Sequence, residues 1–237
     1  MKLQKETDAA EAPAKHGRWY QDACGTAFAM ELVGERWSML LIRELMLGGR
    51  RFSDLRRVLP GISAKVLTER LESLEAAGVL IRRQLAPPAS VQIYELTEWG
   101  YLAEPAIQEL GRWAARSPEH DPTLPLTPVS LMLSMRTMID HEAARAVTAT
   151  MRFEVGDDRF YARLQDGEFT VARAGEDDPP ADFTVRMEKA LPFLRVIYGK
   201  QLLESVSAQG ELAVEGDVDL AKRAFAAFSL PPKIGVP

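Results

Sequence analysis

The densest cluster of charged side chains lies between residues 50 and 83. It contains the basic residues Arg50, Arg51, Arg56, Arg57, Lys65, Arg70, Arg82 and Arg83, and the acids Asp54, Glu69, Glu72 and Glu75. The whole chain is acidic, with 29 Lys and Arg, 34 Asp and Glu and a net charge of −5. This balance argues against a uniformly basic surface, but the one stretch can bind anionic groups such as phosphates.

Groups that could perform catalysis or bind a metal are sparse. Cys24 is the single cysteine, and the three histidines, His16, His120 and His141, are scattered along the chain. An intramolecular disulfide and a Cys/His zinc site are therefore excluded. No glycine-rich phosphate loop or nucleophile motif is present. We expect no cofactor, no metal and no enzymatic activity.

Membrane attachment is not expected either. No apolar run approaches the roughly 18 residues that a bilayer-spanning helix needs. The N-terminal residues 1–20 mix Lys, Glu, Asp and Pro without an apolar segment, which is typical of a flexible arm and not of a secretory signal. We expect a cytoplasmic protein with no membrane partner.

The basic stretch contains an amphipathic helix that begins at Ser63. Leu67, Leu71 and Leu74 follow the spacing i, i+4 and i+7, which places them within about 40° of one another on a helix. They must face a core, so Lys65, Thr68, Glu69 and Glu72 point outward. Gly78 is expected to end the helix in a left-handed conformation.

Other elements surround this helix. Two helices separated by Gly34 are predicted within residues 28–47, followed by a short helix, RFSDLRRVLP, that Ser53 can cap. Two strands, VLIRRQ and VQIYEL, are joined through APPAS, and the pattern leaves open which face of the second strand points inward. A single helix is then predicted over residues 98–116.

The order of four helices, strand, loop, strand and helix is the plan of a winged helix-turn-helix, in which one helix enters the DNA major groove. Small, cationic and hydroxyl side chains at its start can approach bases and phosphates. The candidate DNA contacts are Arg51, Ser53, Ser63, Ala64, Lys65, Thr68, Glu69, Arg82 and Arg83. A solvated surface role is the alternative for each, and Glu69 is either a base reader or a charge that tunes affinity.

The segments GERW, IRELMLG, RRFSDLRR, PGISAKVLTERL, LEAAGV and YELTEWG lie in this order between Cys24 and Arg116. Together they resemble the HxlR family of bacterial winged helix-turn-helix transcription regulators. The resemblance implies a homodimer, built largely from the first and last helices of this domain, on double-stranded operator DNA. The family wing usually reads VPPRVEYSLT, whereas this chain reads APPASVQIYELT and lacks that arginine.

Cys24 lies near the start of the first predicted helix. In some regulators that resemble this chain, a cysteine at about that position senses oxidants or electrophiles, so Cys24 is a candidate redox residue. The alternative, which we favour from the sequence, is that this small side chain is buried by packing.

A boundary is predicted at Ser117 to Pro128, where four prolines occur in twelve residues. Beyond it follow a helix, four strand-like runs that predict a meander, helices broken near Gly199, the strand ELAVEG and a helix that Asp217 caps. The meander, the helices and above all GELAVEGD resemble the sterol-carrier-protein-like fold, which implies an apolar tunnel for a hydrophobic molecule.

The residues expected to line such a tunnel are Leu131, Met132, Met135, Phe153, Phe183, Phe193, Leu194, Ile197, Phe225 and Phe228. Methionine and phenylalanine together suit an adaptable apolar pocket. The alternative for each residue, which the sequence favours, is that it simply fills a core.

We therefore predict an α+β chain with four regions. These are an arm at 1–20, a winged helix-turn-helix domain for DNA binding and dimerisation at 21–117, a Pro-rich linker at 118–128, and a small α/β sterol-carrier-like domain with a mainly antiparallel sheet at 129–237. The predicted function is a transcriptional regulator controlled by a small hydrophobic effector. The alternative is a lipid-binding protein that uses the winged helix for dimerisation only.

Overall fold

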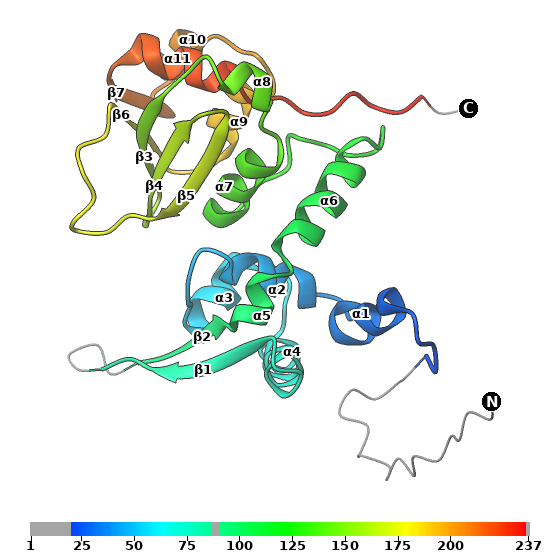
Figure 1. The fold of residues 1–237 in the computed structure, drawn as a ribbon. Helices are drawn as coiled ribbons and strands as arrows, with labels where there is room; N and C mark the ends of the chain where they lie inside the picture. The colour runs from blue at the N-terminus through cyan, green and yellow to red at the C-terminus, as the bar shows by residue number, and fades with distance from the viewer. Residues whose placement is uncertain (1–19, 87–90, 236–237) are drawn as a thin grey trace, which may run out of the picture. The chain divides into compact units, whose positions relative to one another are not determined.

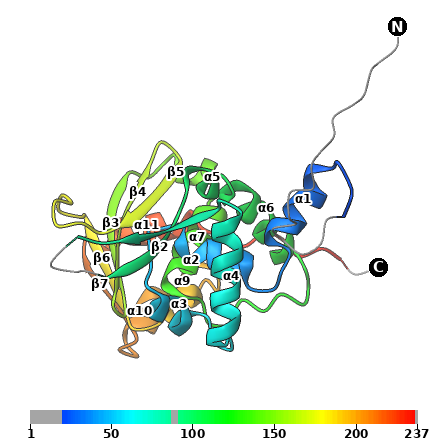
Figure 2. The same cartoon turned by 90° about the horizontal axis from the view of Figure 1, so that it is seen from below.

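The computed structural model describes residues 20–86 and 91–235, and these residues form two compact units. Unit 1 comprises the described residues of 20–45 and 49–101, and unit 2 comprises residues 46–48 and 102–235. Figure 1 labels the elements and Figure 2 gives a second view. The α+β fold class is confirmed.

Unit 1 contains five helices and a two-stranded antiparallel sheet among its described residues. The helices are α1 (Gly25–Val33), α2 (Ser38–Leu45), α3 (Phe52–Val58), α4 (Ala64–Ala76) and α5 (Glu98–Tyr101). The strands are β1 (Leu80–Gln84) and β2 (Gln92–Leu96), which pair from Leu80 with Leu96 to Gln84 with Gln92. The open question about β2 is thereby answered, because Tyr94 and Leu96 point inward.

The core of unit 1 consists of leucines from several helices. Leu41, Leu45, Leu55, Leu67, Leu71 and Leu74 are each at most 1% exposed. Burying a leucine side chain contributes roughly 1.5–3 kcal/mol. The predicted leucine face of α4 is therefore confirmed.

Unit 2 has helices and a five-stranded sheet. Its helices are α6 (Glu104–Ala115), α7 (Pro128–Thr137), α8 (His141–Ala144), α9 (Leu191–Ile197), α10 (Leu203–Ser207) and α11 (Val218–Ala226). Its strands are β3 (Ala149–Val155), β4 (Asp158–Gln165), β5 (Glu168–Arg173), β6 (Phe183–Met187) and β7 (Leu212–Gly216). Helices α7, α9 and α11 cover one face of this sheet, where the phenylalanine core lies (Figure 1).

The sheet order is β5-β4-β3-β6-β7, which corrects the predicted four-strand meander. Strands β3, β4 and β5 do form a meander, but β6 crosses over and pairs parallel with β3. The Asp182 carboxylate accepts hydrogen bonds from the Thr150 backbone N–H at 2.6 Å and hydroxyl at 2.7 Å, which holds the start of β6 beside β3. The sheet remains mainly antiparallel, as predicted.

The helix predicted over residues 98–116 is wrong in one respect, because it is two helices. The chain breaks after α5, and α6 has a proline in its first turn. Pro105 lacks a backbone N–H and its ring clashes with the preceding turn of a continuous helix, so it begins a helix instead. The contacts place α6 in unit 2, whereas the boundary predicted at residue 117 assigns it to the first domain.

Candidate nucleic-acid interface

Helix α4 has well-defined ends. The Ser63 side chain accepts a hydrogen bond from the Val66 backbone N–H at 3.2 Å and caps the helix, which begins where the sequence predicted. At the other end Gly78 has φ of +76°. There the Val79 N–H donates to the Leu74 carbonyl and the Gly78 N–H donates to that of Glu75, both at 2.9 Å. This pair of hydrogen bonds requires a residue in the left-handed conformation, which glycine adopts without strain.

The start of α4 presents the predicted polar side chains outward. Lys65 and Thr68 are exposed, and Ala64 is half-buried. The Lys65 ammonium lies 3.8 Å from the Glu69 carboxylate, and the Lys65 side chain is 84% exposed. An exposed pair of this length contributes little to stability, so Lys65 can exchange Glu69 for another anion.

This geometry also bears on Glu69. Its carboxylate lies one turn along the helix from Lys65, where it lowers the positive potential that Lys65 presents. The contact favours the view of Glu69 as a charge that tunes affinity.

The wing, which we define as β1 and β2, holds its two arginines differently. Arg82 contacts the Glu75 carboxylate through Nε at 2.7 Å and Nη2 at 2.6 Å. Arg83 contacts that of Glu95 through Nη1 at 2.5 Å. The hydrogen bond to Glu75 raises the pKa of Arg82. Both cations must give up a glutamate before they can bind a phosphate, and the sequence did not reveal these partners.

The other candidates lie on or beside α3. Arg51 and Ser53 are exposed, but Ser53 does not cap the helix. The backbone of Arg50 pairs with Tyr94 of β2, so the extended Arg51 is the last residue before the helix begins. Arg56 is also exposed and forms no ion pair with any residue of the described chain. The predicted wing tip at Pro87 and Pro88 lies outside the described residues.

Cys24 precedes α1, and the structure contradicts the packing alternative for the single chain. The thiol is exposed, and no residue of the helix that follows it is buried. A hydrogen bond from the backbone N–H of Thr26 lowers the pKa of Cys24. A lowered pKa at an exposed position favours the reactive thiolate.

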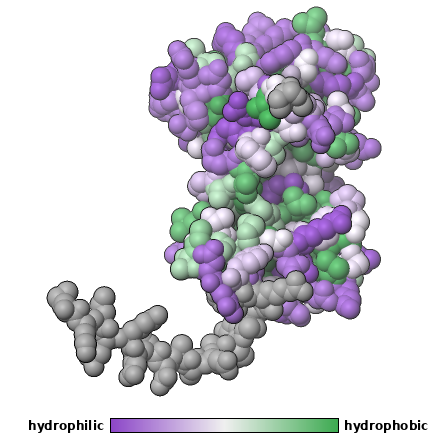
Figure 3. All heavy atoms as spheres, turned by 90° about the vertical axis from the view of Figure 1, so that its right-hand side faces the viewer, coloured by the Kyte–Doolittle hydropathy of each residue, from purple (hydrophilic) through white to green (hydrophobic). Residues whose placement is uncertain are grey.

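Two helices keep large apolar side chains at the surface. On α1, Phe28 is 40% exposed, and on α6 Leu110 and Trp113 are 45% and 74% exposed. Figure 3 shows apolar patches among polar residues on one face of the molecule. Exposed apolar side chains can serve for association where they form a contiguous patch.

The predicted tunnel residues come together in the core of unit 2. All ten are at most 4% exposed. Their aromatic rings pack edge to face, with Phe193 4.9 Å from Phe225 and Phe225 5.8 Å from Phe183 between ring centroids. In this structure these residues fill the core of unit 2, as the alternative stated.

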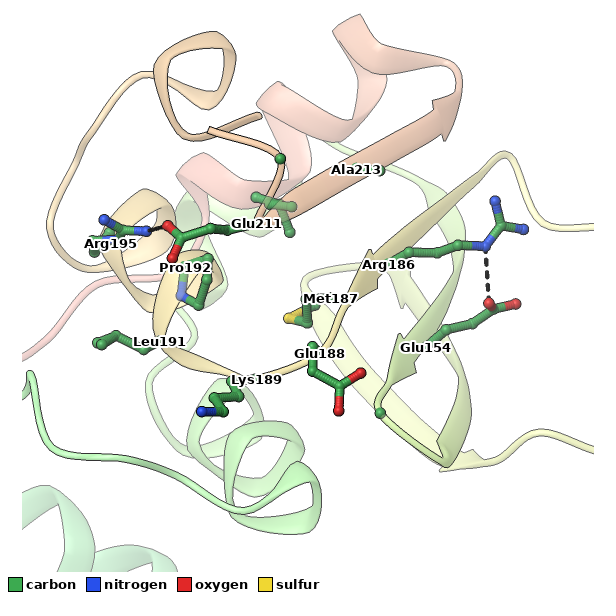
Figure 4. Close-up of a pocket in the computed structure, with 13 residues that line it drawn as sticks. Glu154, Arg186, Met187, Glu188, Lys189, Leu191, Pro192, Arg195, Glu211 and Ala213 are labelled. Atoms are coloured by element: carbon green, nitrogen blue, oxygen red, sulfur yellow. Dashed lines mark hydrogen bonds and ion pairs between the residues drawn. The ribbon is translucent and has the colours of Figure 1, made fainter. Parts of the chain in front are cut away.

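An open cavity of about 850 Å³ lies elsewhere in unit 2 (Figure 4). Its walls come from β6, α9 and the segment that leads into β7. Its lining combines charged side chains, among which Arg186 contacts Glu154 at 2.8 Å and Arg195 pairs with Glu211, with the apolar Met187, Leu191 and Pro192. None of the ten residues predicted for the tunnel lines this cavity.

Residues 20–86 and 91–235 contain neither a metal-binding cluster nor a membrane-spanning helix. No group of three or more His, Cys, Asp or Glu in these residues could hold a metal ion. No helix among them has the length and apolar character needed to cross a bilayer.

Two families match this chain. Residues 32–122 match the family described as HxlR-like helix-turn-helix. Residues 119–233 match the family described as Alkyl sulfatase C-terminal. The first match includes every element from α2 to α6, and the second includes the sheet of unit 2.

Individual relatives agree with the first match. The uncharacterized HTH-type transcriptional regulator YvaP of Bacillus subtilis (strain 168) is 38% identical over 87 residues, which are 36% of this chain and 80% of that protein. The HTH-type transcriptional regulator YodB of the same organism is 41% identical over 87 residues, 36% of this chain and 77% of that protein. A solved structure of quinone-bound YodB is 37% identical, with a TM-score of 0.34, and covers 38% of this chain and 93% of that chain.

Proposed function

Because this chain belongs to the HxlR-like helix-turn-helix family, we propose that it is a bacterial transcriptional regulator that reads operator DNA with α4. The observation that carries the proposal is the two-sided character of α4. Its leucines are buried, while Lys65 and Thr68 are exposed at its capped N-terminal end. The N-terminal residues of a recognition helix are the ones that reach base edges.

The candidate contacts have different roles in this proposal. Lys65 donates to guanine acceptors or phosphate, and the Thr68 hydroxyl serves either. Ser63 caps α4 and presents its hydroxyl to the DNA sugar-phosphate backbone. The small Ala64 side chain lets the helix approach the DNA closely. Arg51 and Ser53 reach phosphates beside the groove, and Arg82 and Arg83 do so only when Glu75 and Glu95 release them.

The regulator acts as a cytoplasmic homodimer in this proposal. The apolar side chains that α1 and α6 leave exposed support this, because a second copy would bury them. The operator is then double-stranded and pseudo-palindromic, with one α4 for each half-site.

We propose further that residues 129–237 form a sterol-carrier-like domain that binds a small hydrophobic effector without catalysing a reaction. The support comes from the residue types in the core. The core around Met132 and Met135 combines flexible methionines with phenylalanines, so its side chains can repack around a bound effector. Because these residues are closed against one another, an effector must open the core. The effector would change the affinity for the operator by binding one conformation of the chain more tightly than another.

A second candidate mode of control is thiol chemistry at Cys24. Its exposure and lowered pKa favour it, and the relative YodB has a quinone-bound form. Modification of the thiol beside α1 would alter the helix through which the dimer is proposed to form.

The proposal is tested by selecting duplexes from a random DNA pool with the purified chain. A regulator enriches one sequence, and its affinity for that sequence falls steeply with salt because phosphate contacts release counterions. If no sequence is enriched, with or without ligands extracted from the host, the lipid-binding alternative replaces the proposal.

A further inference from the structure

The loop between α1 and α2, residues 34–37, reaches helix α4 with two of its side chains. Its sequence is Gly-Glu-Arg-Trp, and it joins Val33 at the end of α1 to Ser38 at the start of α2. Glu35 pairs with a residue of α4, and Trp37 lies beside the turn that precedes this helix. We call these two residues the α1–α2 clamp.

Glu35 is the only acid that pairs with Arg70 within the described residues. The Glu35 carboxylate lies 3.3 Å from Nη2 of Arg70, and the Arg70 side chain is only 21% exposed. A half-buried guanidinium that lost its carboxylate would move toward water, because burial of an unpaired charge is costly. Arg70 therefore serves the contact with the loop, whereas Lys65 and Thr68 of the same helix are exposed to solvent.

Trp37 has a backbone conformation that bulky residues rarely adopt. Its φ is +82°, in the left-handed region where a residue with a Cβ atom is strained. The Trp37 carbonyl accepts a hydrogen bond from the Leu41 N–H at 2.9 Å, so the strained residue directly precedes α2. The Arg36 guanidinium carbon lies 5.1 Å from the centroid of the Trp37 ring. Such strain persists only where surrounding contacts hold the residue in place.

The indole ring lies against the turn that leads into α4. A methyl group placed on Gly61 would be 3.9 Å from Cη2 of Trp37. Gly61 has φ of +91°, and Ser63, which caps α4, follows two positions later. The clamp therefore holds the chain on both sides of residues 63–68, at Gly61 and at Arg70. This segment contains the candidate base contacts of α4.

We propose that Glu35 and Trp37 are positioning residues that hold the N-terminal half of α4 in the orientation that reads an operator. Gly34 alone separates the end of α1 from the clamp, so a displacement of α1 reaches α4 through this loop. The effect on operator binding rests on the proposed function, whereas the positioning of α4 does not depend on DNA. The clamp also gives the thiol chemistry proposed at Cys24 a physical route to α4.

Hydrogen exchange of the full chain without DNA tests the positioning. Glu35→Gln removes the ion pair, and Trp37→Gly removes the indole ring at a residue whose φ glycine adopts without strain. In each variant the amides of residues 66–70 should exchange at least about threefold faster than in the wild type, while those of α3 and β2 keep their wild-type rates. Glu98→Gln removes an exposed acid of α5 and is the control, which should change none of these rates.

Operator affinity, measured by fluorescence anisotropy, separates positioning from charge. Glu35→Gln removes a negative charge, so charge alone would tighten DNA binding, as it should in Glu98→Gln. Loss of the clamp predicts the opposite, a weakening of at least about threefold, because a helix that is not held must be ordered on binding. Arg70→Gln should also weaken binding. The double variant Glu35→Gln, Arg70→Gln should bind no more weakly than Arg70→Gln alone, because both changes remove the same contact.

The proposed clamp is refuted if residues 66–70 keep their wild-type exchange rates in both variants, or if α3 and β2 accelerate equally. It is also refuted if Glu35→Gln tightens operator binding as Glu98→Gln does. A wild type without operator preference counts against the proposed function, and the exchange rates then still decide whether the clamp positions α4.

Discussion

Helix α4 and the wing both carry cations toward the solvent, but they hold them in opposite ways. Lys65 on α4 has a loose contact of 3.8 Å with Glu69. Arg82 and Arg83 of the wing have contacts of 2.6 and 2.5 Å with their glutamates. In the proposed interface, a cation with a weak acidic partner can bind DNA directly, whereas a cation with a strong partner must first lose that partner. The difference teaches that a basic residue in a sequence is a DNA contact only as far as its acidic neighbours allow.

The largest expected effect separates the buried side of α4 from the exposed side of the wing. Leu71→Ala removes a side chain that is 1% exposed, and it should lower the free energy of unfolding by about 2–5 kcal/mol. Ile81→Ala in β1, where the side chain is 43% exposed, is the matched control and should have a far smaller effect. Urea denaturation followed by circular dichroism measures both, and equal losses would contradict the assigned core.

The next effect concerns base recognition. Lys65→Ala and Thr68→Ala should each weaken binding to the selected operator by about 1–3 kcal/mol, with relaxed specificity at one base position. Arg83→Ala should cost less, because Arg83 must leave Glu95 before it binds DNA. Fluorescence anisotropy with labelled duplexes gives the three affinities. A larger loss for Arg83→Ala than for Lys65→Ala would reverse the comparison.

A smaller effect, of opposite sign, is expected on the wing. Glu75→Gln removes the carboxylate that holds Arg82, so binding should tighten a few-fold and its salt dependence should steepen by about one phosphate contact. Glu98→Gln is a control that removes an equal charge from α5. If both variants behave alike, overall charge and not the release of Arg82 explains the change.

The smallest effect compares the N-termini of α1 and α4. The Ser63 hydroxyl accepts a hydrogen bond at the start of α4, whereas α1 begins after an exposed thiol, Cys24, whose pKa is lowered by a hydrogen bond from the Thr26 backbone N–H. Alkylation by iodoacetamide should therefore reach half its maximal rate at a lower pH in the folded chain than in urea. Cys24 is the only cysteine, so the signal has one source. Identical pH profiles would show that folding does not activate the thiol.

Much of α4 was predictable because its signals are local. The spacing of Leu67, Leu71 and Leu74 fixed its inner face, and Ser63 and Gly78 fixed its ends. The residues on its outer face follow from the same periodicity. Such features depend on neighbours within about one helical turn.

The features that the sequence did not reveal are long-range. Glu95 is twelve positions from Arg83, and Glu75 reaches Arg82 only because the chain turns at Gly78. The parallel pairing of β6 with β3 depends on Asp182, which meets Thr150 across 32 positions. The break before α6 is an exception, because Pro105 was a visible signal within the predicted helix.

The most direct test of the account is the ratio of operator affinity to random-duplex affinity for the wild type and for the double variant Lys65→Ala, Thr68→Ala. The wild type should show a clear preference for one sequence. The double variant should lose at least about tenfold in this ratio, with nearly unchanged affinity for random DNA. A double variant that keeps the full preference, or a wild type with none, would contradict the claim that α4 reads DNA.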